Sequence, residues 1–505
     1  MKDTVLGAGR AISEAMREGW HAPFQSVRKQ PRLGVVSARK SAITPGMRYI
    51  STRGKAPIVD FKGALLAGLA SDGGLYVPES LPQFSPAEIA AMAHLTYEEL
   101  AFTLLKPFVG DSFSAAQLRA CIDKAYASFR HPAIAPLVQL GPQHFVLELF
   151  HGPTLAFKDF ALQLVGHLMD EALRDSADRA VVLGATSGDT GSAAIAGCRG
   201  RANLDIVILY PRGRTSAVQR RQMTTTGEAN VHAMEVDGTF DDCQDLVKAL
   251  FADAQLRAGT KLLAVNSINW VRVLAQVVYY FYAALRLGAP ANPLNFCVPT
   301  GNFGDIFAGY IARGMGLPMG KLMIATNKND ILSRAVHTGE YTITGVDATL
   351  SPSMDIQIAS NFERLLFDLY GRDGARISQL IADFRATKSL TLSADAHASF
   401  TAMFAAHAVD DATTLATIAK THADTGYLLD PHTAVGVAAT QAIAVPGITV
   451  TLATAHPAKF PEAVVEAAGL HPALPPHMAD LFARDEKITP LANDAAALMH
   501  YIRSL

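Results

Sequence analysis

The sequence AVVLGATSGDTG occupies residues 180–191 and combines an apolar run with a glycine-rich turn. Residues 180–183 predict a buried strand, and the small residues 192–197 predict a helix directly after the turn. The same order returns at residues 295–299, where an apolar run precedes the glycines of residues 301–304 and a helical pattern. Apolar strands that alternate with helices indicate an α/β fold with parallel sheets covered on both faces.

Four further apolar runs predict strands, at residues 145–150, 205–210, 230–236 and 449–453. A helical pattern at residues 240–254 follows one of them. In open parallel sheets, ligands bind beyond the carboxyl ends of the strands. We therefore expect the loops that follow these strands to share one edge and to carry the functional residues. These loops begin at His151, Gly184, Gly301 and Thr454.

The composition indicates a large globular protein. Its 505 residues are 50% hydrophobic and 18% charged, and this length predicts two or three domains. Because the formal net charge is −2, nucleic acid and anionic membranes are not expected as main partners. No apolar run reaches the roughly 20 residues that a spanning helix needs. The four cysteines lie far apart without a CxxC pair, so we expect them buried and reduced in a cytoplasmic protein, with no metal site.

The first 46 residues hold eight Lys or Arg and three acids, and they lack the apolar core of a secretory signal. A transit peptide is one interpretation, although the acids and the few serines weaken it. We favour a disordered extension or a gene start assigned too far upstream. From Met47 to about residue 143 the pattern is more ordered, with helical periodicity at residues 61–69 and 86–107 and a short strand at residues 75–78.

Two glycine-rich loops are suited to anions. Residues 301–305, Gly-Asn-Phe-Gly-Asp, join a predicted strand to a helix, so their N–H groups and the helix N-terminus can face a phosphate. A tight structural turn is the alternative, and the missing P-loop lysine argues against a nucleoside triphosphate. Residues 184–191 add the hydroxyls of Thr186, Ser187 and Thr190, which could bind a carboxylate. An ordinary helix N-cap explains one or two of these residues but not all.

Lys158 lies among Leu155, Phe157 and Phe160. A lysine in this setting either extends to solvent or is desolvated, and a desolvated lysine has a lowered pKa and becomes a nucleophile. Considered alone, an exposed lysine is the simpler interpretation. Together with two anion-binding loops, Lys158 suits pyridoxal 5'-phosphate, which has one phosphate and a carbonyl, and a substrate with a carboxylate.

Several segments resemble the threonine synthase family of fold-type II pyridoxal-phosphate enzymes. They run in order from Met47 to near the C-terminus and comprise residues 49–54, 72–78, 151–163, 184–194, 266–272, 301–305 and 454–460. The segments around Lys158 and Thr454 are the most specific. The glycine-rich motif at residues 184–191 is shared by many fold-type II enzymes, although Asp189 replaces an Asn that is common outside the threonine synthase branch.

The resemblance implies roles for individual residues. Lys158 would hold the cofactor as a Schiff base and later carry protons, and Thr454 would face the pyridine nitrogen. The cofactor phosphate would lie against Gly301, Asn302, Phe303, Gly304 and Asp305. The substrate would contact Thr186, Ser187, Asp189 and Thr190. Candidate cations for its leaving phosphate are Arg272 and Lys459, and a surface ion pair is the alternative for each.

The expected organisation has four parts. Residues 1–46 form an extension and residues 47–143 an N-terminal domain. Residues 144–180 and 291–505 form a large cofactor-binding domain, and residues 181–290 form a small α/β substrate domain. The sequence gives no indication of the oligomeric state.

The implied reaction is that of a pyridoxal-phosphate-dependent carbon–oxygen lyase, which converts O-phospho-L-homoserine and water to L-threonine and phosphate. One alternative is a dehydratase or another β-eliminating enzyme of fold type II. Since a fold does not fix a function, a cofactor-binding homologue without this activity is a second alternative. A nucleotide-binding protein is a third.

Overall fold

The computed structural model describes residues 46–174 and 179–505. The predicted extension at residues 1–46 therefore lies outside the described residues, apart from Gly46. Within the two described ranges, no helix is long and apolar enough to cross a membrane.

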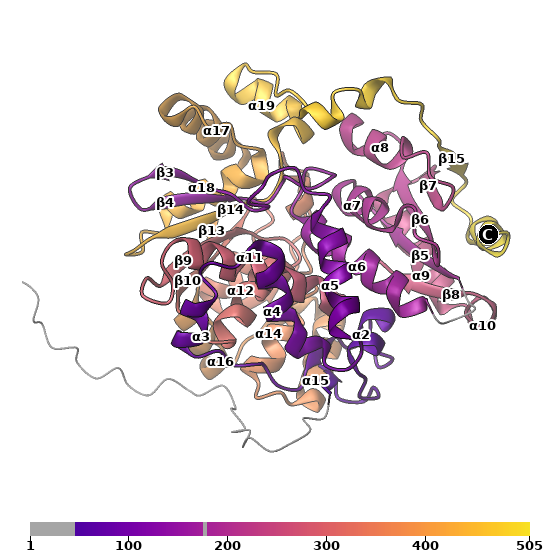
Figure 1. Ribbon diagram of the computed structural model, residues 1–505, viewed down its shortest axis with the longest axis horizontal. Helices are drawn as coiled ribbons and strands as arrows, with labels where there is room; N and C mark the ends of the chain where they lie inside the picture. Colours follow the sequence, from indigo (N-terminus) through magenta and orange to yellow (C-terminus); the bar gives the residue numbers. More distant parts are fainter. Residues whose placement is uncertain (1–45, 175–178) are drawn as a thin grey trace, which may run out of the picture. The chain divides into compact units, whose positions relative to one another are not determined.

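The larger of two main sheets has six strands in the order β13-β10-β9-β14-β4-β3 (Figure 1). Neighbouring strands run parallel except β3, which pairs antiparallel with β4. The bounds are Leu137–Gly141 for β3, His144–Glu148 for β4, Leu294–Pro299 for β9, Met319–Thr326 for β10, Phe404–Ala408 for β13 and Thr449–Ala453 for β14. Every residue of β9 and β14 is buried, as expected for interior strands of a parallel sheet.

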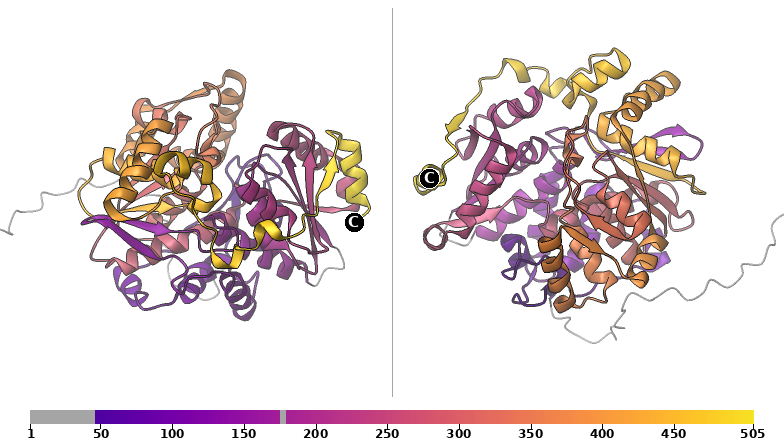
Figure 2. Two further views of the ribbon diagram at one scale, coloured as in Figure 1. Left: turned by 90° about the horizontal axis from the view of Figure 1, so that it is seen from above. Right: turned by 180° about the vertical axis from the view of Figure 1, so that it is seen from behind.

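The second sheet has five parallel strands in the order β15-β7-β6-β5-β8. The bounds are Ala180–Ala185 for β5, Leu204–Pro211 for β6, Val231–Val236 for β7, Lys261–Ala264 for β8 and Thr489–Leu491 for β15. Strand β15 comes from the C-terminal segment, which runs past α8 to reach β7 (Figure 1). Helix α20 (Ala495–Arg503) then packs against α9 (Phe240–Ala252), at the edge of this sheet (Figure 2).

The N-terminal part is mostly helical. Strands β1 (Tyr49–Ser51) and β2 (Tyr76–Pro78) pair antiparallel, and the helices are α2 (Phe61–Ala67), α3 (Pro86–Ala91), α4 (Tyr97–Val109) and α5 (Ala115–Tyr126). The predicted helix at residues 86–107 is wrong in one respect, since it is two helices. Ser85 and Thr96 each form a capping box with the glutamate three residues later, so a new helix begins at Tyr97.

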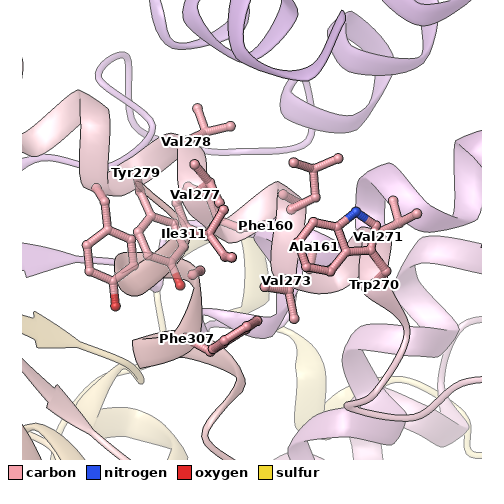
Figure 3. Packing of buried hydrophobic residues seen from close by; sticks show 14 of the residues in the cluster. Phe160, Ala161, Trp270, Val271, Val273, Val277, Val278, Tyr279, Phe307 and Ile311 are labelled. Atoms are coloured by element: carbon pink, nitrogen blue, oxygen red, sulfur yellow. The ribbon is translucent and has the colours of Figure 1, made fainter. Parts of the chain in front are cut away.

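Four central helices carry the buried core between the sheets. They are α6 (Lys158–Leu173), α7 (Asp189–Cys198), α11 (Trp270–Arg286) and α12 (Gly304–Gly314). Helix α11 is buried from Trp270 to Leu285, and α6 packs against both α7 and α11. Figure 3 shows buried residues of α6, α11 and α12 in this core. The ring of Phe160 lies edge-on to that of Tyr279, with the ring centres 5.5 Å apart. A residue at the start of α6 is therefore held by a rigid core.

The remaining elements of the described ranges are nine helices, one pair of strands and four 3-10 turns. The helices are α8 (Ala217–Thr224), α10 (Ala254–Gly259), α13 (Ile331–Thr338), α14 (Phe362–Leu369), α15 (Gly374–Thr387), α16 (Ala394–Met403), α17 (Asp411–Thr425), α18 (Pro431–Ala442) and α19 (Pro461–Ala468). Strands β11 (Glu340–Thr342) and β12 (Ser389–Thr391) form a separate antiparallel pair. Four 3-10 turns complete the set, at Pro352–Met354, Pro457–Lys459, Pro476–Met478 and Leu481–Ala483.

The α/β fold with parallel sheets is confirmed. The predicted domain boundaries stay a prediction, but the strand order of the second sheet concerns the C-terminal one. Residues 489–491 pair with β7 in the second sheet, whereas the sequence placed them with the first. The physical reason is that strand pairing depends on neighbours distant in the chain, which the local pattern does not contain.

Candidate active site

One cavity lies where the loops after β4, β5, β9 and β14 meet the first residues of α11. Most of the predicted site residues line it, namely Lys158, Asp189, Thr190, Arg272, Gly301, Asn302, Phe303, Gly304, Asp305 and Thr454. Three predicted residues do not line this cavity, namely Thr186, Ser187 and Lys459. The cavity is therefore lined by residues that follow strands of both sheets.

Lys158 is the first residue of α6 and is only 8% exposed. Its Nζ donates to Asp189 Oδ2 at 3.4 Å and lies 4.9 Å from the centre of the Phe157 ring. Burial lowers the pKa of Lys158, and nearby Lys459 and Arg272 lower it further, while Asp189 acts in the opposite direction. A lowered pKa increases the neutral fraction of the amine, which is the nucleophilic form.

The segment before Lys158 is tied to the segment after β14. Leu155 has a left-handed backbone, with φ of 62°, and the next residue, Ala156, forms an isolated bridge with Ala455. Phe157 N donates to Thr454 O at 2.9 Å, and His456 N donates to Leu155 O at 3.0 Å. These two bonds hold Lys158 and Thr454 at the same cavity.

Thr454 is 5% exposed and directly follows β14. Its N–H donates to the Thr433 hydroxyl at 3.2 Å. The hydroxyl of Thr454 itself makes no hydrogen bond to any residue in the described ranges, and the residue lines the cavity. This hydroxyl is therefore free to bind a ligand, as donor or acceptor.

Asp189 is the most heavily bonded carboxylate of the site. Its Oδ1 accepts from Lys459 Nζ at 2.7 Å and from Gln219 Nε2 at 2.9 Å, and its Oδ2 accepts from the Ser353 hydroxyl at 3.3 Å. Burial by itself would raise the pKa of Asp189, but Lys459 and Lys158 hold that pKa well below its usual value. Asp189 is therefore a fixed negative charge beside the Lys158 amine.

Lys459 is fully buried in the 3-10 turn that follows β14. Besides Asp189, its Nζ contacts Thr154 O at 2.7 Å. The sequence offered a surface ion pair as the alternative for this residue, and the pair is instead a buried one.

The loop of residues 301–304 presents its main chain to the cavity. Phe303 is left-handed, with φ of 62°, and its ring packs away on Phe362 at 5.4 Å. A Cβ at Gly301 would lie 2.9 Å from Ser353 O, so a larger residue would not fit there. Helix α12 begins at Gly304, and its first N–H groups and positive dipole end face the same space, which favours an anion.

Asp305 adds a carboxyl group in the first turn of α12. Its Oδ1 accepts from the hydroxyls of Tyr279 and Tyr280, whereas its Oδ2 is buried and has no partner among the described residues. Burial raises the pKa of Asp305 to about 7.

Arg272 lies in the first turn of α11 and is 7% exposed. Its Nη1 is buried without a hydrogen-bond partner, and the side chain forms no ion pair within residues 46–174 and 179–505. Burial lowers the pKa of Arg272 to about 10. A buried cation without a counter-ion is costly, so this guanidinium indicates an anionic ligand.

The three hydroxyl residues of the loop after β5 have different surroundings. The hydroxyl of Thr186 accepts from Gly188 N at 2.9 Å and Gly191 N at 2.8 Å, so it shapes the loop. Ser187 is exposed to solvent, and Thr190 lines the cavity. Of the three, Thr190 is the one that lines the cavity.

Sequence reasoning missed several residues of the cavity, above all His432 and Ser353. His432 Nδ1 bonds Asp430 Oδ2 at 2.8 Å, and its Nε2 accepts from Ser353 N at 3.2 Å. A signal for His432 was present, because Asp430 caps α18 immediately before a Pro-His-Thr run. The segment that carries Ser353 has no recognisable motif.

These residues fit pyridoxal 5'-phosphate. The amine of Lys158 matches its carbonyl, and the main-chain cradle at residues 301–304 matches its phosphate. Arg272 Nη1 and the Thr454 hydroxyl are left for other polar groups of a ligand.

Comparisons with known proteins agree with this chemistry. Three sequence models match in order: "Threonine synthase N terminus" at residues 48–126, "Pyridoxal-phosphate dependent enzyme" at residues 130–383 and "Threonine synthase, C-terminal" at residues 433–502. The threonine synthase of Pseudomonas aeruginosa is 54% identical over 461 residues, which cover 90% of this chain and 98% of that protein. The Saccharomyces cerevisiae threonine synthase is 42% identical over 458 residues, which cover 82% of this chain and 88% of that protein.

Solved structures give the same result. The pyridoxal-phosphate-bound threonine synthase of Brucella melitensis superimposes with a TM-score of 0.89 at 51% identity, covering 91% of this chain and 99% of that one. The yeast threonine synthase gives a TM-score of 0.86 at 39% identity, covering 90% and 98%. With the cofactor site described above, these matches show that the chain belongs to the threonine synthase family of pyridoxal-phosphate-dependent lyases.

Proposed function

We propose that the protein converts O-phospho-L-homoserine and water to L-threonine and phosphate. The observation that carries the proposal is the buried guanidinium of Arg272, which lines the cavity and has no counter-ion among the described residues. The substrate brings a carboxylate and a phosphate to a site that also takes the cofactor phosphate. The site must therefore bind three anionic groups. The main-chain cradle of residues 301–304 can bind one phosphate, and a fixed cation such as Arg272 can bind the other. The relatives named threonine synthase support the same reaction.

When bound, pyridoxal 5'-phosphate supplies a carbonyl that binds an amine and a ring that takes up negative charge. Lys158 supplies the amine, and its lowered pKa favours the neutral form that attacks a carbonyl. Released from that role, the same Nζ is placed to accept a proton from a substrate carbon. Asp189 Oδ2, 3.4 Å away, orients the amine.

Each anionic group has a proposed place. We assign the cofactor phosphate to Gly301, Asn302, Phe303, Gly304 and Asp305. We assign the amino-acid end of the substrate to the loop of Thr186, Ser187, Asp189 and Thr190, in which Asp189 and Thr190 line the cavity and Thr186 shapes the loop. We assign the leaving phosphate to Arg272 rather than Lys459. This choice rests on their surroundings, because Lys459 Nζ already has two partners at 2.7 Å and Arg272 Nη1 has none.

Thr454 is the proposed partner of the pyridine nitrogen. Its hydroxyl has no hydrogen bond to the described part of the chain and can either donate to an unprotonated nitrogen or accept from a protonated one. A neutral partner stabilises the protonated ring less than a carboxylate does. We therefore expect a moderate electron sink, which limits side reactions.

The test is a comparison of substrates with purified protein. O-phospho-L-homoserine should give L-threonine and phosphate in equal amounts, measured by amino-acid analysis and a phosphate assay, and Lys158→Ala should give neither. Faster release of a 2-oxo acid and ammonia from L-threonine or L-serine would instead identify a dehydratase. A visible absorption band of bound cofactor without turnover of any of the three would identify a homologue without the activity.

We also propose that the enzyme is cytoplasmic and that its partner is a small-molecule substrate. All four cysteines, Cys121, Cys198, Cys243 and Cys297, are buried and unpaired. Burial raises the pKa of each thiol, to about 11 for Cys243 and about 12 for the others, which disfavours oxidation and suits a reducing compartment. Fractionation of cells that produce the protein, followed by activity measurement, tests the location.

A further inference from the structure

We propose that Lys459 competes with Lys158 for the Asp189 carboxylate and thereby limits how strongly Asp189 holds a proton on the Lys158 nitrogen. Lys459 is then a positioning residue that acts through Asp189, without touching substrate or cofactor. The proposal rests on the proposed function in one respect, since it takes Lys158 as the amine that binds the cofactor.

The distances show that Lys459 contacts Asp189 more closely than Lys158 does. Asp189 has two lysine neighbours, and Lys459 Nζ lies at 2.7 Å whereas Lys158 Nζ lies at 3.4 Å. Gln219 Nε2 bonds the same oxygen as Lys459, at 2.9 Å. The carboxylate is therefore held by its contacts on the Oδ1 side, and Lys158 has only a long contact to Oδ2.

Burial and a second contact hold Lys459 in this position. Its side chain is fully buried and its Nζ also contacts Thr154 O at 2.7 Å. Thr154 belongs to the segment that leads into Lys158, and Asp189 begins α7. The ammonium of Lys459 therefore joins the segments that position the other two charged groups.

The charges that face Lys158 decide the direction of the effect. Lys459 and Arg272 are cations, Asp189 is an anion, Asp305 is a carboxyl group near the same amine, and His432 lies close to Asp189. With Lys459 present, the negative charge of Asp189 is shared between two ammonium groups. Without Lys459, Asp189 would pair with Lys158 alone and would stabilise the protonated nitrogen.

A purely structural ion pair is the competing explanation. A buried pair that loses one partner leaves an uncompensated charge, so any variant of Lys459 is expected to lower stability. The two explanations differ in the titration of the Lys158 nitrogen, which a merely structural role would leave unchanged.

The experiment is a pH titration of the visible absorption of the cofactor bound to the full-length holoenzyme. The variants are Lys459→Met, Lys459→Arg and Asp189→Asn with Lys459→Met. The control is Arg53→Met, which breaks another ion pair, that of the part-buried Arg53 with the buried Glu363 at 2.9 Å, away from the cavity. Thermal melts show how much each change costs in stability.

We expect Lys459→Met to move the titration midpoint to higher pH by about one unit or more, the usual effect of a close unshared carboxylate. Lys459→Arg retains the cation and should stay close to the parent. The double variant removes both charges, so its midpoint should return toward the parent. Arg53→Met should lower the melting temperature without moving the midpoint.

An unchanged midpoint in Lys459→Met, or an equal shift in Arg53→Met, would overturn the proposal. Should Lys459→Met fail to fold, Lys459→Gln removes the same charge but keeps a polar end group, and its midpoint must again lie above that of the parent. Threonine formation is measured separately on the parent protein. A parent that forms no threonine refutes the proposed function, while the titration still decides the role of Lys459.

Discussion

Gly166→Ala tests whether the crossing of α6 and α7 sets the geometry of the site. The two helices meet at Gly166 and Gly197, each about two turns beyond the charged residue that begins its helix. A Cβ on Gly166 would lie 2.1 Å from Gly197 O and 2.6 Å from Gly197 C. Both contacted atoms are main chain and cannot rotate away, so the helices must separate.

The expected loss follows from two opposing terms. Alanine is favoured over glycine inside a helix by about 1 kcal/mol. Overpacking in a core costs typically about 1–3 kcal/mol and sometimes more, and main-chain contacts belong at the upper end. We therefore expect a net loss of about 2 kcal/mol in the free energy of unfolding.

The same movement should affect catalysis. Lys158 begins α6 and Asp189 begins α7, and their contact of 3.4 Å depends on how the helices cross. A misplacement of about 1 Å can cost roughly 100-fold in rate. Gly166→Ala should therefore lose activity even in the fraction that stays folded, and the cofactor should bind more weakly.

Urea unfolding and threonine formation measure the two effects. The control is Gly259→Ala in α10, where no described atom lies within 4 Å of the added Cβ. It should be neutral or slightly stabilising and should keep full activity. If Gly166→Ala unfolds at the same urea concentration as the parent or the control, the crossing does not set the geometry and the reasoning is wrong.

Four further predictions concern the site and the N-terminus. Borohydride reduction and peptide mass mapping should place the pyridoxyl group on Lys158, and its discovery on another lysine would refute the assignment. A chain that starts at Met47 should keep most activity, because residues 1–46 precede the family match; a loss above tenfold, about 1.4 kcal/mol, would contradict this. Arg272→Ala should weaken use of O-phospho-L-homoserine while the cofactor spectrum stays intact, and loss of the cofactor would assign Arg272 to the cofactor instead. Thr454→Asp should shift that spectrum and the ratio of threonine to side products, whereas Thr454→Ala should change it less. If neither variant changes them, Thr454 only caps a turn.

Much of the sheet architecture was predictable because its signals are local. Strand β14 was predicted at residues 449–453 and has those bounds. An interior parallel strand is apolar throughout, and the turn that follows needs glycines or hydroxyls, so each unit is marked within a dozen residues. The loop of residues 301–305 was found for the same reason.

Features that depend on distant neighbours were not predictable. Strand β15 has only three residues and is defined by its pairing with β7, far away in the chain. Strand β10 was missed although it lies inside the larger sheet, because Gly320 and Lys321 interrupt its apolar pattern. Ser353 reaches the cavity from a segment without motif or periodicity, so its place follows from tertiary packing alone.

Lys158 and Lys459 show why burial alone does not assign a function. In the sequence both lysines stand beside phenylalanine, and in the structure both are buried. Their partners differ, since Lys459 has an oxygen of Asp189 and one of Thr154 at 2.7 Å, whereas Lys158 has one contact at 3.4 Å and lines the cavity. A lysine that is desolvated and has an incomplete partner can lose its proton more readily. The reactive lysine is therefore recognised by its incomplete set of partners. Those partners come from distant parts of the chain, so no single stretch of sequence shows which lysine has them.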